Sequence, residues 1–222
     1  MDNMNTVPNW EQIDVVLLDM DGTLLDKHFD DHFWEEYVPQ QYAAKNGISV
    51  EDAREKLMEH YRAVEGTLNW TDLNFWSDEL GLDIPKLKRQ VDHLISVHPF
   101  VIPFLDRIRE IGKRVYLVTN AHSKTLDLKM EKTLLAGKFD AMITSQDLGA
   151  PKEQLESWEK LQQLIQFDPG TTLLAEDTID VLKAAEKFGI RFLVHISKPS
   201  TRKPPMPSEK YYSIHTFLDI TP

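Results

Sequence analysis

Five short apolar runs, each ending in polar residues, constrain the fold of this 222-residue chain more than any other feature. The first, residues 14–18, is rich in valine and leucine and leads directly into acidic residues, as expected for a strand that is buried on both faces. Amphipathic helical patterns separate the runs. This alternation predicts right-handed crossovers and an α/β fold with a doubly wound parallel sheet. The other predicted strands are 114–118, 141–144, 171–175 and 191–195, and the predicted helices are 101–111, 123–135, 153–165 and 178–188.

Residues 27–97 interrupt this alternation, because they contain several helical patterns and no convincing strand. Ser49 is a suitable N-cap for a helix over 50–64, and Gly47 and Gly81 are suitable helix ends. We therefore expect a helical cap domain of residues 27–97, inserted after the first strand into a core domain of residues 1–26 and 98–222. After the fifth strand, the proline-rich residues 198–207 predict a surface loop, and residues 211–214 predict an edge strand.

The composition limits the partners of the chain. A formal net charge of −11 with scattered lysine and arginine argues against binding of a nucleic acid polymer, which requires clustered basic residues. A membrane-spanning helix needs roughly twenty apolar residues in sequence, and no such run is present. The absence of cysteine suits a reducing compartment, and residues 1–14 do not resemble an export signal. We expect a cytoplasmic protein that does not bind membranes, and the sequence leaves its oligomeric state open.

Asp19 and Asp21 directly follow the first predicted strand, where an α/β sheet usually places its active site. When the strand ends and the chain turns, two carboxylates separated by one residue can converge. One can then act as a nucleophile while the other transfers protons. Gly22 permits the close turn that this arrangement needs. A pair of aspartates alone is common in surface turns, but an apolar strand leading into Asp-x-Asp-Gly-Thr-Leu is far more specific.

Residues 14–26, with the sequence DVVLLDMDGTLLD, resemble the first signature of the haloacid dehalogenase (HAD) superfamily. Three further signatures follow in the expected order. Thr119 and Asn120 match a hydrophobic-x-Thr/Ser-Asn element, and Lys152 ends a Gly-x-Pro-Lys element. Glu176 and Asp177 form the fourth, where other members of the superfamily have two aspartates. The resemblance covers nearly the whole chain, with the helical insertion matching the cap of the superfamily.

The resemblance implies a Mg²⁺-dependent phosphomonoester hydrolase. Asp19 would attack phosphorus and form an aspartyl-phosphate, and Asp21 would first protonate the leaving oxygen and then deprotonate water. The implied Mg²⁺ ligands are the Asp19 carboxylate, the Asp21 backbone carbonyl and Asp177, with Glu176 binding directly or through water. The groups implied to stabilise the phosphoryl group are Lys152, the Thr119 hydroxyl and the Asn120 backbone amide.

The helical insertion adds information about the substrate. Residues 29–46, 67–76 and 80–84 resemble the cap of a bacterial subgroup described as GMP/IMP 5′-nucleotidases, which implies a purine nucleoside monophosphate as the small-molecule substrate. Aromatic side chains near the cap mouth can stack on a purine, although each can equally supply the core of the insertion. The candidates are Phe33, Trp34, Trp70 and Trp76. His28 and His32, next to Asp30 and Asp31, are interpreted as a polar helix start and not as a metal site.

Other functions remain open. A sugar-phosphate or phosphoglycolate phosphatase, or a β-phosphoglucomutase-like phosphotransferase, would use the same core chemistry, because the cap sets specificity. Asp21 disfavours a dehalogenase, since dehalogenases of the superfamily usually lack this acid. A non-catalytic protein that binds phosphate or a protein partner is disfavoured, because all the expected chemical residue types are present.

Overall fold

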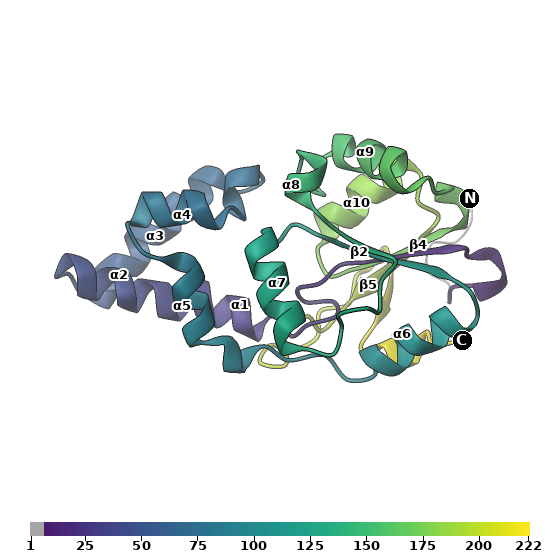
Figure 1. Cartoon of the computed structure of the whole chain (residues 1–222), viewed down its shortest axis with the longest axis horizontal. Coiled ribbons are helices and arrows are strands. Elements are labelled where there is room, and N and C mark those ends of the chain that lie inside the picture. The colour runs from purple at the N-terminus through teal and green to yellow at the C-terminus, as the bar shows by residue number, and fades with distance from the viewer. Residues whose placement is uncertain (1–6) are drawn as a thin grey trace.

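The computed structural model describes residues 7–222 and contains a six-stranded sheet in which all paired strands are parallel. The strand order is β3-β2-β1-β4-β5-β6, so the chain crosses from one side of β1 to the other between β3 and β4 (Figure 1). The predicted doubly wound parallel α/β fold is therefore confirmed. The strands are β1 (Val15–Leu18), β2 (Arg114–Thr119), β3 (Ala141–Thr144), β4 (Thr172–Glu176), β5 (Phe192–Ile196) and β6 (Tyr212–Ile214).

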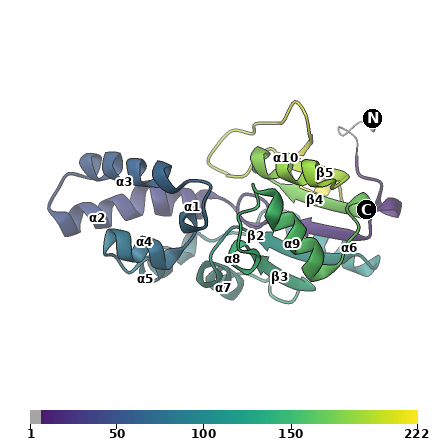
Figure 2. The same ribbon diagram turned by 90° about the horizontal axis from the view of Figure 1, so that it is seen from above.

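Helices cover both faces of the sheet, which explains why its strands read as continuous apolar runs. Within β1, Val16 and Leu18 pack in one hydrophobic cluster with α6 and α7, whereas Val15 and Leu17 pack in a second cluster with α9 and α10. Figures 1 and 2 show these two helical layers on opposite sides of the strands. The helices are α6 (Val101–Glu110), α7 (Ser123–Lys132), the short α8 (Ser145–Leu148), α9 (Leu155–Ile165) and α10 (Ile179–Phe188).

The strand and helix positions agree with the sequence prediction to within a few residues. The largest difference is in α7, which was expected to extend to residue 135 but ends at Lys132. Thr133 adopts an extended backbone, and its hydroxyl donates to the carbonyl of Lys129 at 2.8 Å. The side chain thereby satisfies a carbonyl at the helix end and replaces a further helical turn. The predicted edge strand is present as β6, which pairs with β5.

A group of helices between β1 and α6 lies beside the sheet, away from its two helical layers (Figures 1 and 2). The predicted N-cap is present, since the Ser49 hydroxyl accepts a hydrogen bond from the Asp52 amide at 3.0 Å. Gly47 and Gly81 end their helices in the left-handed conformation, as predicted. The elements are α1 (His28–His32), the π-helical segment η2 (Phe33–Tyr37), α2 (Val38–Asn46), α3 (Val50–Val64), the short η3 (Leu68–Trp70), α4 (Leu73–Leu80) and α5 (Ile84–Gln90).

Two adjacent chain segments connect these helices to the sheet. The Asp26 amide donates to the carbonyl of Ser96 at 2.9 Å, and the His98 amide donates to the carbonyl of Leu24 at 2.9 Å. The chain therefore leaves and re-enters the sheet region at one place. The division into a core and a cap of residues 27–97 stays a prediction.

No helix in residues 7–222 is both long and apolar enough to cross a bilayer.

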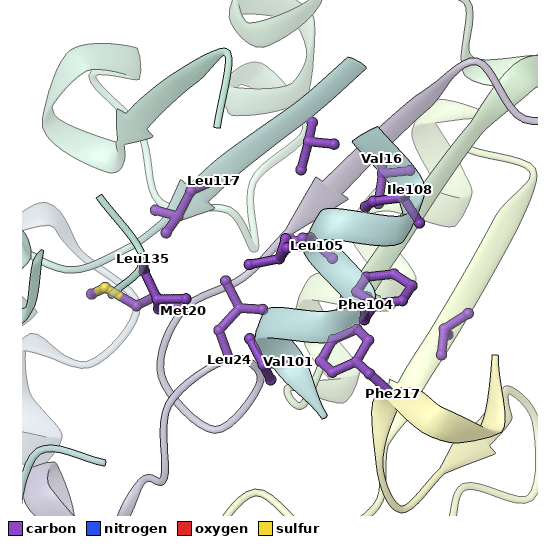
Figure 3. Packing of buried hydrophobic residues seen from close by; sticks show 14 of the residues in the cluster. Val16, Met20, Leu24, Val101, Phe104, Leu105, Ile108, Leu117, Leu135 and Phe217 are labelled. Atoms are coloured by element: carbon purple, nitrogen blue, oxygen red, sulfur yellow. The ribbon is translucent and has the colours of Figure 1, made fainter. Parts of the chain in front are cut away.

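Phe104 anchors α6 to the sheet and to the C-terminal segment. Its ring is fully buried and lies 4.5 Å, centroid to centroid, from the ring of Phe217 (Figure 3). We expect Phe104→Ala to lower the free energy of unfolding by about 3–5 kcal/mol, because it removes a large apolar side chain and leaves a cavity. Urea unfolding at equilibrium measures this change. Leu218→Ala is the control, since Leu218 is 59% exposed and its loss should change stability by less than about 0.5 kcal/mol. Equal effects of the two substitutions would contradict this account of the core.

Candidate active site

The carboxyl ends of β1, β2 and β4 meet where the strand order reverses, the usual ligand-binding position in an open α/β sheet. A pocket lies between this edge of the sheet and the group of helices α1–α5. All seven site residues predicted from the sequence line this pocket, although the sequence positions span more than 150 residues. They are Asp19, Asp21, Thr119, Asn120, Lys152, Glu176 and Asp177.

Lys152 joins two buried carboxylates at the floor of the pocket. Its Nζ donates to Asp19 Oδ1 at 2.5 Å, to Glu176 Oε2 at 2.7 Å and to the carbonyl of Val118 at 3.0 Å. Burial lowers the pKa of Lys152, but the carboxylates of Asp19 and Glu176 outweigh burial and raise it. Burial raises the pKa of Asp19, and burial together with the Asp19 charge raises the pKa of Glu176. The lysine thus carries the positive charge that these two acids require.

Asp177 completes a cluster of three carboxylates. One ligand oxygen from each of Asp19, Glu176 and Asp177 lies within 4.8 Å of the others. Gly22 has φ +88°, and a β-carbon there would lie 2.6 Å from Asp177 Oδ2, so this approach requires glycine. Lys27 Nζ lies 2.8 Å from the same Asp177 oxygen. When all three acids are ionised, Lys27 and Lys152 leave the cluster with one excess negative charge, and its oxygen donors suit a hard divalent cation such as Mg²⁺.

Thr119 is the last residue of β2 and Asn120 follows it, and both line the pocket. The Thr119 hydroxyl accepts a hydrogen bond from the Ala121 amide at 3.0 Å. The Asn120 side chain donates to the Glu153 carboxylate at 3.0 and 3.2 Å and accepts from the Lys152 amide at 3.0 Å. Asn120 therefore fixes the loop that carries Lys152, a role for its side chain that the sequence did not indicate.

Asp21 has a partner that sequence reasoning missed. Lys129 Nζ of α7 lies 2.5 Å from Asp21 Oδ1 and 2.6 Å from Asp30 Oδ2 of α1. Burial, with the charge of Asp30, raises the pKa of Asp21 to about 6 against the opposing effect of Lys129. The sequence does contain a signal for Lys129. This residue lies three positions after Leu126 and one before Met130, and both of these residues are on the buried face of α7. A charged residue on an apolar helix face indicates a buried ion pair.

The helical side of the pocket is aromatic. Trp34, Tyr61, Trp70 and Trp76 all line it, and Trp70 is the most accessible of the four, at 39% exposure. Trp76 is almost fully buried, and its ring nitrogen donates to the carbonyl of Trp70 at 2.8 Å. Phe33, the remaining aromatic candidate, is fully buried in the core of the helical group. Tyr61 was not among the candidates, because nothing in the pattern of α3 distinguishes it from an ordinary core residue.

The polar start of α1 agrees with its structural interpretation. The His28 amide donates to Asp26 Oδ1 at 3.0 Å, and His32 pairs with Glu36 at 3.1 Å. Asp30 pairs with Lys88 and Lys129. Over residues 7–222, the acidic, histidine and cysteine side chains grouped closely enough to share a metal ion are the three carboxylates at the pocket floor.

Comparison with known proteins agrees with this geometry. A family model described as haloacid dehalogenase-like hydrolase matches residues 13–189. The chain belongs to the haloacid dehalogenase-like hydrolase family. A relative within it is the GMP/IMP nucleotidase YrfG of Escherichia coli (strain K12), which is 37% identical over 95% of this chain and 93% of its own length.

Solved structures of the family have the same fold. The HAD phosphatase from Thermococcus onnurineus matches with a TM-score of 0.79 and 26% identity, covering 93% of this chain and 95% of its own. The HAD hydrolase YfnB from Bacillus subtilis, bound to magnesium, matches with a TM-score of 0.60 and 18% identity, covering 93% and 96% of the two chains. At this lower identity, the likeness shows the fold alone.

Substitution of Lys152 tests the charge balance of the pocket floor. We expect Lys152→Met to lower the free energy of unfolding by about 3–5 kcal/mol at neutral pH without added metal, because it leaves two buried carboxylates unpaired. The loss should shrink as the pH falls, since protonation of Asp19 and Glu176 removes their charges. Denaturant unfolding at several pH values measures both effects. Lys183→Met is the control, because Lys183 forms an exposed pair with Asp180 that contributes about 0–1 kcal/mol. A loss no larger than that of the control would contradict the assigned role of Lys152.

Proposed function

We propose that this protein is a Mg²⁺-dependent phosphomonoester hydrolase that acts on purine nucleoside 5′-monophosphates. One observation carries the proposal: Asp19, Lys152, Glu176 and Asp177 meet at the floor of a pocket whose opposite wall is aromatic. A phosphate group and the flat aromatic face of a base suit these two environments. Residues 27–97 would act as the cap that supplies the aromatic wall.

Mg²⁺ would be held by the carboxylates of Asp19 and Asp177 and the backbone carbonyl of Asp21, with Glu176 binding directly or through water. When bound, it would neutralise part of the phosphate charge, which otherwise repels an anionic nucleophile. Lys152, the Thr119 hydroxyl and the Asn120 backbone amide would orient and stabilise the phosphoryl oxygens.

In the first half-reaction, an oxygen of the Asp19 carboxylate forms a bond to phosphorus. The bond between phosphorus and the substrate's ester oxygen breaks, and its electron pair stays on that oxygen. The carboxyl group of Asp21 gives its proton to the same oxygen, so the nucleoside leaves as a neutral alcohol. The products of this step are the alcohol, an aspartyl-phosphate at Asp19 and an ionised Asp21.

In the second half-reaction, Asp21 takes a proton from water while the water oxygen bonds to phosphorus. The bond between phosphorus and the Asp19 oxygen breaks, and its electron pair returns to the Asp19 carboxylate. Phosphate leaves, and both aspartates regain their starting protonation states. The two aspartates therefore have distinct tasks, with Asp19 acting as the nucleophile and Asp21 as the acid and base.

The purine assignment rests on two independent supports. The relative YrfG, 37% identical over nearly the whole chain, is named a GMP/IMP nucleotidase. In this chain, Trp34 and Trp70 line the pocket on the side opposite Asp19, and Trp70 is partly exposed. Stacking of a base on an aromatic side chain contributes about 1–3 kcal/mol, which would separate a nucleotide from a sugar phosphate that lacks the base.

The test is phosphate release from IMP, GMP, AMP, ribose 5-phosphate, glucose 6-phosphate and phosphoglycolate, with Asp19→Asn as the blank. We expect kcat/KM for IMP and GMP to exceed that for ribose 5-phosphate by about tenfold to hundredfold, the effect of one stacked base. A preference for sugar phosphates or phosphoglycolate would retain the chemistry but overturn the purine assignment. Rates equal to those of the blank on every substrate would overturn the hydrolase proposal.

Metal binding is tested by thermal unfolding with increasing MgCl₂. We expect the midpoint of the wild type to rise, because a ligand at 100 times its Kd stabilises the folded state by about 2.7 kcal/mol. Asp177→Asn should largely abolish the rise. Asp180→Asn is the control, since Asp180 is an exposed acid near the start of α10, and it should preserve the rise. An equal response in the two variants would argue against metal binding at the pocket floor.

A further inference from the structure

A second buried ion cluster connects the sheet side of the pocket to the helical group. Lys129 of α7 contacts both Asp21 and Asp30, and Lys88 of α5 contacts Asp30 Oδ1 at 2.9 Å. The side chains of Lys129 and Lys88 are only 1% and 3% exposed. When both aspartates are ionised, the two lysines balance their charge, so this form of the cluster can be buried without an unpaired ion. The proposed mechanism uses Asp21 and none of the other three residues.

Lys129 occupies a fixed position because α7 also packs against the helical group. Leu128 lies in the hydrophobic cluster of that group, although it belongs to α7. Glu131 and Lys132 of the same helix pair with Arg89 at 3.1 Å and with Asp92 at 2.9 Å. Figures 1 and 2 show α7 at the border between the sheet and these helices. The Lys129 ammonium is thus held from both sides of the pocket.

We propose that Lys129 is a positioning residue that orients the carboxyl group of Asp21 for proton transfer, and that Asp30 holds the Lys129 ammonium in place. This inference rests on the proposed hydrolase function. Lys129 engages Oδ1 of Asp21. The second carboxyl oxygen is then the one that exchanges a proton with the substrate's ester oxygen and, later, with water.

The contacts explain why this task needs a lysine held by a second acid. An aspartate carboxyl group can rotate about two side-chain bonds, and a single strong hydrogen bond to one oxygen restricts both. Asp30 gives the Lys129 ammonium a second partner, which fixes its position relative to Asp21. Loss of the Asp30 charge would therefore loosen the constraint on Asp21.

The prediction concerns the leaving group. A nucleoside 5′-oxygen is a poor leaving group and requires a proton from Asp21, whereas p-nitrophenolate leaves readily without one. The ratio kcat/KM reports the steps up to cleavage of the ester bond and excludes hydrolysis of the aspartyl-phosphate. A defect in the orientation of Asp21 should consequently reduce kcat/KM for IMP far more than for p-nitrophenyl phosphate. A general loss of packing should reduce both values by a similar factor.

The experiment compares wild type, Lys129→Met, Lys129→Arg and Lys88→Met on IMP and p-nitrophenyl phosphate at one saturating Mg²⁺ concentration. We expect Lys129→Met to lower kcat/KM for IMP by about 10²–10³, within the range of general acid catalysis, and for p-nitrophenyl phosphate by less than about tenfold. Lys129→Arg should restore part of the IMP activity. Lys88→Met is the matched control, because it removes a similarly buried lysine that contacts Asp30 and not Asp21. It should change kcat/KM for IMP and for p-nitrophenyl phosphate by similar factors.

Equal losses on the two substrates in Lys129→Met would overturn the inference, as would a substrate-selective loss of the same size in Lys88→Met. If Lys129→Met does not fold, judged by circular dichroism, Asp30→Asn provides the same comparison by weakening the hold on Lys129. A selective loss with IMP would then support the inference, and equal losses would overturn it. Wild-type activity equal to that of Asp19→Asn on both substrates would refute the hydrolase function itself, a result distinct from these.

Discussion

The ion pairs of Lys152 with Asp19 and Glu176 are the interaction on which the rest of this structure depends. Carboxylates at the end of a buried parallel sheet are costly unless a cation lies among them. Lys152 supplies that cation from a loop after β3. The Asn120 side chain keeps this loop in place by hydrogen bonds with the Lys152 backbone amide and the Glu153 carboxylate. The residual negative charge of the cluster then makes the same position suitable for a divalent cation. Stability and the proposed chemistry are thus linked at the pocket floor. The buried negative charge that lowers the stability of the fold is also the charge that the proposed metal binding and nucleophilic attack use.

The pocket has two ion clusters with different roles. The cluster around Lys152 lies within the sheet region, whereas the cluster around Lys129 joins the sheet region to the helices on the other side of the pocket. Asp19 and Asp21 are only two residues apart, yet each belongs to a different cluster. This separation gives the two aspartates distinct environments, as their proposed roles of nucleophile and acid–base group require. It also provides a physical route by which the position of the helical group can affect chemistry at the sheet.

The aromatic wall of the pocket gives the helical group a role beyond covering the sheet edge. Most of its aromatic side chains form the core that a small helical unit needs, and Phe33 and Trp76 are buried accordingly. Trp34 lies in the π-helical segment η2 and lines the pocket, and Trp70 lies in the short η3 and does the same. Irregular helical segments present these rings without interrupting the packing of the regular helices. The same group can therefore have a hydrophobic core of its own and still line the pocket with aromatic rings.

The sequence by itself determined the order of strands and helices, the helical insertion and the seven residues that meet in the pocket. The strands, helices and insertion were predictable because each depends on local pattern, as apolar runs define strands. The site residues were predictable from the resemblance of four short motifs to the HAD superfamily, and parallel strands bring the carboxyl ends that carry these motifs to one edge of the sheet. Only the tertiary structure decided which side chains become partners. Lys129, Asp30 and Lys88 come from three helices, and no local pattern in the sequence pairs them with one another. Likewise, the sequence did not distinguish Phe33 from Trp70 as a residue that stacks on the substrate. In the structure, Phe33 is buried in the helical core and Trp70 lines the pocket. Pairing between distant segments depends on how helices dock, and docking is set by the summed packing of many side chains, which no local pattern encodes.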